Sequence, residues 1–360
     1  MNAAPPMTAG LSRYCLSKNP FQPEKPKSPI QLSAKPPDVP LLLRHPNLKL
    51  FDKLDKFLDS AVKKVNSATY VLITGPDSTG KSSIAHYVVD AYCRKFNASV
   101  DLAIPLELPA TNSFPVEMLK KWLQTLLFLS RPYLAATDEL REIRNATSSI
   151  CQTNVGALNG DILHDATVAL VEKLRNPVGR VVAAYYDNNS QSASHAPGIL
   201  SLALYVFSFA PMLFVAAVPT DSDFADVGKK FGSFDQGAEF LRIDLAPVKL
   251  ADAKLLIEER WQPGHDPCPL SAPECAAENS VCKKQSPNHP NPFGNLNWTQ
   301  ITPDKVIPIE NLLQGLAGIL KNKTPDEQQG TCWPHDKQLE VTRAELEQAY
   351  VFYKMYLESP

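Results

Sequence analysis

The 360-residue chain lacks a strong net charge, because 36 basic side chains stand against 38 acidic ones for a formal charge of −2. No global basic field favours nucleic acid, so the sequence indicates no nucleic-acid partner. The N-terminus, Met-Asn-Ala-Ala-Pro-Pro, lacks the basic and apolar regions of a secretory signal peptide. The seven cysteines are an odd number scattered over a long chain, which is unlike a secreted disulfide framework. We therefore expect a cytoplasmic protein, with the nucleus and the mitochondrion left open.

One long uncharged run, residues 199–219, is long enough to resemble a transmembrane span. Pro211 lies in its middle, and the two halves differ in character. Residues 198–210 have the composition of a buried helix, whereas residues 212–218 form a β-rich run of strand length. A helix leading into a central parallel strand has the same hydropathy, since such strands are buried on both faces. We expect no membrane span.

Composition divides the chain into three parts. Residues 1–40 are rich in proline, serine and lysine and poor in aliphatic side chains, which predicts a disordered tail. Residues 41–248 are predicted to form the folded core domain. Residues 249–360 are predicted to form a small α-helical lid that is interrupted by a proline- and cysteine-rich insert at 262–305.

Strand and helix patterns alternate through the predicted core. Strand patterns fall at residues 70–74, 99–108, 180–186, 212–218 and 239–245, and helix patterns at 48–65, 81–96, 115–130, 136–146, 162–175 and 198–210. Such alternation predicts an α/β fold with a parallel five-stranded sheet covered by helices on both faces. Strand signals stop after Leu245, and helix patterns follow at 250–261, 307–321 and 342–357. Thr342 and Glu345 form a capping box for the last of these helices.

The segment from Gly75 to Ser82 reads Gly-Pro-Asp-Ser-Thr-Gly-Lys-Ser and matches the P-loop pattern G-x-x-x-x-G-K-[ST]. It follows a predicted strand and opens a predicted helix, which is the context the pattern requires. Backbone N–H groups close around the phosphates, Lys81 neutralises them, and the Ser82 hydroxyl binds Mg²⁺. The predicted cofactors are ATP and Mg²⁺. The predicted nucleotide-binding residues are Gly75, Pro76, Asp77, Ser78, Thr79, Gly80, Lys81, Ser82 and Ser83.

A magnesium-bound phosphate site needs a second acidic group at the tip of another strand. The run Val-Val-Ala-Ala-Tyr-Tyr ends on Asp187, which we predict as the second metal ligand and Walker B aspartate. Asn188 follows where hydrolytic ATPases usually carry glutamate. An amide can orient water but cannot accept its proton, so slow turnover is expected. Thr220 follows the fourth strand and either contacts the γ-phosphate or serves as a turn residue before Asp221.

With these residues in place, the chain resembles the AAA+ ATPases, closest to their origin-recognition-like and STAND branches. The resemblance rests on the P-loop, on Asp187, on Thr220 as sensor 1 and on the tract Phe-Leu-Arg-Ile-Asp-Leu-Ala-Pro from Phe240. It implies the sheet order 5-1-4-3-2, ATP-driven switching, and protein partners or self-association. Three features depart from the family: Asn188 replaces the glutamate, the helix around Gly315 lacks a sensor 2 arginine, and only Lys229 and Lys230 lie where an arginine finger is expected.

The insert holds a loose cluster of metal-ligating residue types: His265, Cys268, Cys275, Cys282 and His289. Zinc ligands usually come in close C-x₂₋₄-C pairs, which this cluster lacks. Zinc binding completed by Cys332 or His335 and a solvated loop with free thiols both remain open.

Three functions fit the sequence. The first is an ATP-binding AAA+/STAND-like switch or assembly factor with slow ATP hydrolysis. The second is a P-loop kinase of a small metabolite, although Arg131 is the only arginine in residues 110–135, where an acceptor site would lie. The third is an ATP-binding scaffold that does not hydrolyse, which Asn188 would suit.

Overall fold

The structure of the chain is a computed structural model. It describes residues 48–64, 66–76, 79–98, 102–106, 115–176, 178–187, 196–219, 238–249, 254, 257, 293–294, 296–297, 306–307, 309–323 and 340–348. These residues divide between two compact units, with the boundary in the chain at Ala246–Pro247. The predicted disordered tail, residues 1–40, lies outside the described residues.

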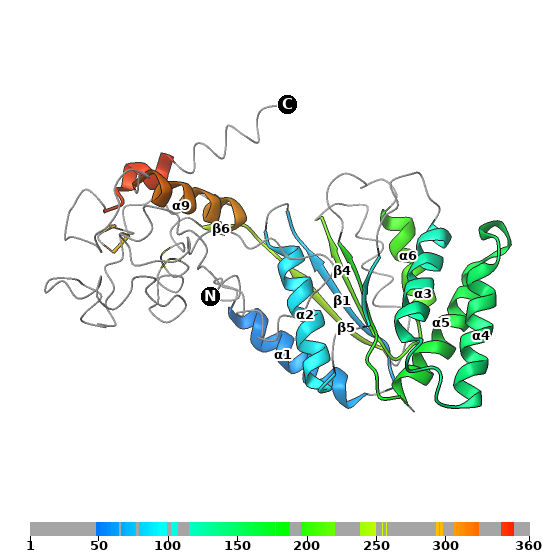
Figure 1. The fold of residues 1–360 in the computed structure, drawn as a ribbon. Helices are drawn as coiled ribbons and strands as arrows, with labels where there is room; N and C mark the ends of the chain where they lie inside the picture. Colours follow the sequence, from blue (N-terminus) through cyan, green and yellow to red (C-terminus); the bar gives the residue numbers. More distant parts are fainter. Residues whose placement is uncertain are drawn as a thin grey trace, which may run out of the picture. The chain divides into compact units, whose positions relative to one another are not determined.

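The larger unit contains a five-stranded, wholly parallel sheet (Figure 1). Its strands are β1 (Thr69–Thr74), β2 (Ala103–Pro105), β3 (Ala183–Asp187), β4 (Leu213–Val218) and β5 (Glu239–Asp244). Their order is β2-β3-β4-β1-β5, which is 5-1-4-3-2 from the other edge, so the predicted sheet order is confirmed. The predicted strand at 99–108 is described only over the three residues of β2.

Helices cover both faces of this sheet. They are α1 (Leu48–Lys63), α2 (Lys81–Lys95), α3 (Pro115–Ser130), α4 (Asp138–Gln152), α5 (Gly160–Arg175) and α6 (Ala196–Phe207), with a 3-10 turn at Val155–Ala157. Alternate residues of a strand face opposite sides. In β1, Val71 and Ile73 accordingly pack in one core cluster with α1 and α2, while Tyr70 and Leu72 pack in the other with α3, α5 and α6.

The fourth helix packs on α3 and α5 (Figure 1). It runs to Gln152, beyond the predicted end at 146, because Cys151 is buried against the core. Two side chains of α3 bind carbonyls at the end of α4: Lys120 Nζ donates to Thr153 O at 2.6 Å, and Gln124 Nε2 donates to Cys151 O at 2.8 Å. Lys173 of α5 pairs with Glu139. These bonds fix α4 against its two neighbours.

The long uncharged run of the sequence forms α6 and β4, as predicted. Both β1 and β4 are buried at all six of their positions, which is expected for central strands of a covered parallel sheet. Among the described residues, none of the helices combines the length and the apolar character that crossing a membrane requires.

The smaller unit contains α9 (Ile309–Lys323), which buries Leu312, Leu316 and Leu320 along one face. A two-stranded antiparallel ribbon joins β6 (Val248–Lys249) to β7 (Val306–Ile307). The expectation that strands end at Leu245 is therefore wrong, since two-residue strands leave no periodic signal. The capping box is confirmed: Thr342 N donates to Glu345 Oε2 at 2.8 Å, and Glu345 N donates to Thr342 Oγ1 at 3.3 Å.

Candidate functional site

The loop between β1 and α2 needs glycine at both of its ends. A Cβ on Gly75 would lie 2.8 Å from the Leu245 carbonyl oxygen and 2.9 Å from Thr79 Oγ1, both too close. Gly80 has a φ of 88° in the left-handed region and is the N-cap of α2. Only glycine adopts that conformation without cost. The two glycines of the P-loop pattern are therefore explained by close approach and by backbone conformation.

Lys81 opens α2 and turns back into the loop. Its side chain is 7% exposed, and Nζ donates to the carbonyl oxygens of Gly75 at 2.9 Å and Pro76 at 2.7 Å. Thr79 Oγ1 donates to the same Pro76 carbonyl at 2.7 Å. A buried ammonium is tolerated only with acceptors around it. The carbonyl groups of the loop thus hold the Lys81 ammonium group inside it.

The N-terminus of α2 faces the same loop. Gly80 has no side chain to cap the helix, and the first turn contains no acidic residue. The first N–H groups of a helix have no partner within it and carry the positive end of the helix dipole. Ser82 and Ser83 lie half-buried on this turn. Lys81, the two glycines and the helix N-terminus together fit a phosphate group.

Asp187 is the last residue of β3 and lies at the carboxyl ends of the parallel strands, where the P-loop also begins. In the strand register, Asp187 pairs with Ala217 of β4, and Ala217 pairs with Ile73 of β1. Asp187 therefore lies two strands from β1, about 10 Å across the sheet, and level with Ile73, which precedes Gly75 by two residues. Its side chain is half-buried. A carboxylate and the Ser82 hydroxyl at one edge are oxygen ligands of the kind that Mg²⁺ takes.

His86 lies beside this edge and was not predicted from the sequence. Its ring packs edge-on against Tyr185 of β3, with 5.3 Å between ring centroids. Burial lowers the pKa of His86, and the negative charge of Asp187 opposes that shift. The signal was present in the sequence, because His86 follows Ser82 by four residues and so shares its face of α2.

A hydrogen bond between Thr74 and Asp244, which was also not predicted, joins the C-terminal ends of β1 and β5. Thr74 Oγ1 donates to the Asp244 carboxylate, and Arg242 Nε donates to the same group at 2.8 Å. Burial alone would raise the pKa of Asp244, but these two hydrogen bonds and the nearby positive charges hold it below its usual value. Leu245 N also donates to Thr74 O at 2.7 Å. This pairing places Leu245 against Gly75.

Several predicted site residues lie outside the described residues: Asp77, Ser78, Asn188 and Thr220. The same holds for the histidines and cysteines of the insert and for Cys332 and His335. Within the described part of the chain, no group of three or more metal-ligating side chains gathers. Cys93 and Cys151 are buried there, and neither forms a disulfide.

The parallel sheet has the order 5-1-4-3-2, with a P-loop after β1, which lies between β4 and β5, and an acidic residue at the tip of β3. This is a P-loop NTPase fold, with the sheet order that the resemblance to the AAA+ ATPases implies. No protein-family model and no curated protein matches the sequence.

Three solved structures, all of AAA+ ATPases, are similar to this fold. The ORC2 protein of Aeropyrum pernix, solved as ADPNP and ADP complexes, is 14% identical with a TM-score of 0.38, over 68% of this chain and 55% of that one. PCH-2 of C. elegans is 11% identical with a TM-score of 0.34, over 88% and 70% of the two chains. A chain of Drosophila ORC bound to GC-rich DNA and Cdc6 is 13% identical with a TM-score of 0.37, over 83% and 44%.

These likenesses are distant, with every TM-score below 0.5. This chain spans just over half the length of the Aeropyrum protein. The assignment of the fold therefore rests on the sheet order and on the position of the P-loop.

Proposed function

We propose that this chain binds ATP with Mg²⁺ at the P-loop and acts as an AAA+-like nucleotide switch that hydrolyses ATP slowly. The observation that carries the proposal is the placement of Lys81. Its ammonium is buried and held by two carbonyls inside a loop that requires glycine at both ends. A phosphate is the group that such a loop, opening on a helix N-terminus, is suited to hold.

Each residue of the site has a role in this proposal. Lys81 exchanges its carbonyl partners for phosphate oxygens, and the first N–H groups of α2 bind the same phosphates. Ser82 and Asp187 hold Mg²⁺, which neutralises the charge that develops on the phosphates. Thr220 contacts the γ-phosphate. Asn188 orients the attacking water without accepting its proton, which is the reason for slow turnover.

The central test is Lys81→Ala. The variant should bind a fluorescent ATP analogue at least about 100-fold more weakly, because it removes charge-assisted hydrogen bonds to the phosphates. Lys95→Ala is the matched control, since Lys95 lies on the same helix and pairs at the surface with Asp59. Surface ion pairs contribute little, so this variant should bind normally. Unchanged affinity in a folded Lys81→Ala variant would remove the proposal.

The switching role needs a separate measurement. Size-exclusion chromatography with light scattering should show a change of mass when ATP and Mg²⁺ are added, and Lys81→Ala should abolish that change. A constant mass would favour the second candidate, a scaffold that binds ATP without hydrolysis, which Asn188 supports. A steady-state ATPase assay then separates slow turnover from none.

A further inference from the structure

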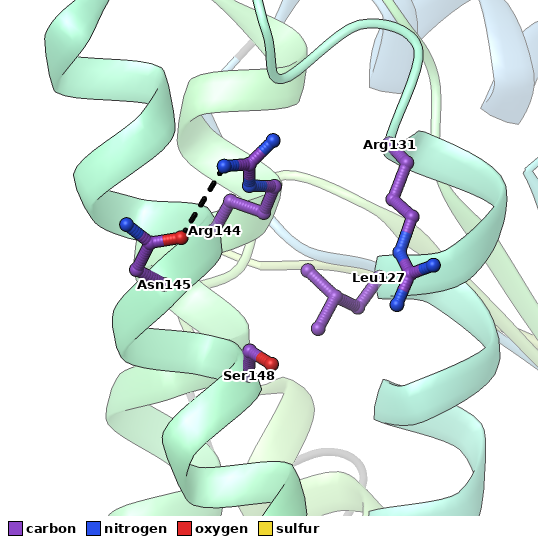
Figure 2. Close-up of a pocket in the computed structure, with 5 residues that line it drawn as sticks. All are labelled: Leu127, Arg131, Arg144, Asn145 and Ser148. Carbon is purple, nitrogen blue, oxygen red and sulfur yellow. Dashed lines mark hydrogen bonds between the residues drawn. The ribbon is translucent and has the colours of Figure 1, made fainter.

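A pocket of about 280 Å³ lies between the end of α3 and the middle of α4 (Figure 2). Its lining residues are Leu127, Arg131, Arg144, Asn145 and Ser148. Figure 2 shows the two arginine side chains coming from opposite walls of the gap, with Leu127 and Ser148 below them. We call this the arginine pocket. It lies on helices that take no part in the P-loop.

The charges of the two arginines are not balanced by carboxylates among the described residues. Across the described ranges, neither Arg131 nor Arg144 forms an ion pair with a carboxylate, and Arg144 Nη2 only donates to Asn145 Oδ1 at a long 3.4 Å. Arg141 on the same helix is different, because it pairs with Asp138. The residues three and four positions from Arg144 are Leu140, Arg141, Thr147 and Ser148, so no acid is within reach along the helix.

A structural role explains one arginine and not the other. Arg131 follows the last residue of α3, where the negative end of the helix dipole favours a cation. Arg144 lies in the middle of α4, where no such field acts. This second guanidinium lines the same pocket and has no ion pair with a carboxylate among the described residues.

The pocket is already formed. The Arg131 guanidinium lies over the Phe128 ring, 5.5 Å from its centroid, which limits the freedom of the side chain. The hydrogen bonds from Lys120 and Gln124 to the end of α4 fix the two walls against each other. Leu127 forms a buried floor, while Phe128 is 63% exposed on the neighbouring surface. A ligand would meet a cationic cavity beside an apolar rim.

We propose that the arginine pocket binds a phosphoryl group. A phosphoryl group carries a charge of about −1.5 to −2 at pH 7 and has three acceptor oxygens, which matches two guanidinium groups. A carboxylate would balance only one of them. The Ser148 hydroxyl and the Asn145 amide can donate to further oxygens. The phosphoryl group belongs either to a small phosphate ester or to a phosphorylated side chain of a protein.

The test is isothermal titration calorimetry at constant ionic strength on the full chain with Lys81→Ala, so that the P-loop does not compete. The probes are inorganic phosphate, a short neutral peptide with one phosphoserine, and the same peptide with glutamate instead. Phosphate and the phosphopeptide should bind, and the glutamate peptide should bind at least about tenfold more weakly, because it has one charge and fewer acceptors. A phosphopeptide that binds more tightly than phosphate identifies a protein source, and equal affinities identify a small ester.

Arg131→Gln and Arg144→Gln should each weaken phosphopeptide binding by about 10- to 100-fold, the effect of losing a charge-assisted hydrogen bond. Arg141→Gln is the matched control and should bind normally, since Arg141 is already paired outside the pocket. Arg131 and Arg141 are exposed and Arg144 is half-buried, and circular dichroism should confirm the fold of each variant. In a chain with Lys81 intact, Arg144→Gln should bind the ATP analogue normally.

Three results would overturn the proposal: no binding to the Lys81→Ala chain, equal binding of the glutamate peptide, or equal losses from Arg141→Gln and Arg144→Gln. None of them bears on the P-loop.

Discussion

The P-loop and the arginine pocket both present positive charge, yet they are built in opposite ways. The P-loop is one continuous stretch of backbone in which Lys81 is buried and held by two carbonyls. The arginine pocket is assembled from side chains of two helices, and its guanidinium groups have no carboxylate partner among the described residues. A backbone site depends on the path of the chain, whereas a side-chain site depends on which residues face each other.

The difference has energetic consequences. The ammonium of Lys81 is removed from water, so its interactions are little screened by salt and its acceptors are required. Arg131 is exposed and Arg144 is half-buried, so their field is screened at physiological ionic strength. We therefore expect salt to weaken binding at the arginine pocket more than at the P-loop.

The largest predicted effect is that of Gly75→Ala, which should change the P-loop and leave the arginine pocket intact. One added methyl group would lie 2.8 Å from the Leu245 carbonyl oxygen, so the loop must move. We expect the affinity for an ATP analogue to fall at least about tenfold and the stability to fall by about 1–3 kcal/mol, as for other overpacked sites. Phosphopeptide binding at the arginine pocket should not change.

Gly198→Ala is the control for that experiment. A Cβ on Gly198 meets nothing within 4 Å, and the residue lies in α6. Alanine should stabilise the helix by about 0.5–1 kcal/mol, so the two glycine substitutions should have effects of opposite sign. Thermal unfolding measures both. If Gly75→Ala left stability and nucleotide affinity unchanged, the close approach to Leu245 would not constrain the loop.

The second prediction concerns turnover. If Asn188 replaces the water-activating glutamate, the unsubstituted chain should hydrolyse ATP slowly and Asn188→Glu should raise kcat. A well-placed general base contributes about 10²–10⁴-fold, and a grafted one should reach only the lower part of that range. Asn188→Gln is the control, because it has the length of glutamate without a carboxylate, and it should not raise kcat. Fast hydrolysis by the unsubstituted chain would assign the base to another residue, with Asp221 and Asp223 as the first to test.

The P-loop, the strand order and the covered faces of the sheet could be predicted because each leaves a continuous or periodic pattern in the sequence. Gly75 to Ser82 is a single uninterrupted motif. The buried strands β1 and β4 are continuous apolar runs, and the amphipathic helices repeat with the helical period. Even the uncharged run at 199–219 could be resolved, since Pro211 separates a helix from a strand.

Features that depend on pairing between distant segments could not be predicted. Thr74 and Asp244 are 170 residues apart, and only the register of β1 against β5 brings them together. The ribbon of β6 and β7 is two residues long on each side. In the sequence, Arg131 stood out only as the single arginine of residues 110–135. The antiparallel packing of α3 on α4, which places Arg131 beside Arg144, leaves no pattern in either helix.

The smallest predicted effect is a dependence of stability on pH through His86, beside the P-loop. Burial lowers the pKa of His86 in the folded chain below its ordinary value of 6.5. The unfolded chain therefore binds more protons as the pH falls, so the contribution of His86 to stability is complete above pH 6.5 and is lost as the pH falls through the folded-state pKa.

Urea unfolding at a series of pH values from 8 to 5 measures this contribution, with the unsubstituted chain compared with His86→Gln. One group changes the free energy of unfolding by at most about 1.4 kcal/mol per pH unit, and the partial exposure of His86 makes the effect smaller. The unsubstituted chain should lose more stability than the variant as the pH falls below 6.5, and the two curves should run parallel above it. Since Asp187 opposes the shift, Asp187→Asn should lower the pKa of His86 further and steepen the loss. Parallel curves over the whole range would mean that His86 is solvated in the folded chain, and its packing on Tyr185 would then not exclude water from the edge where Asp187 lies.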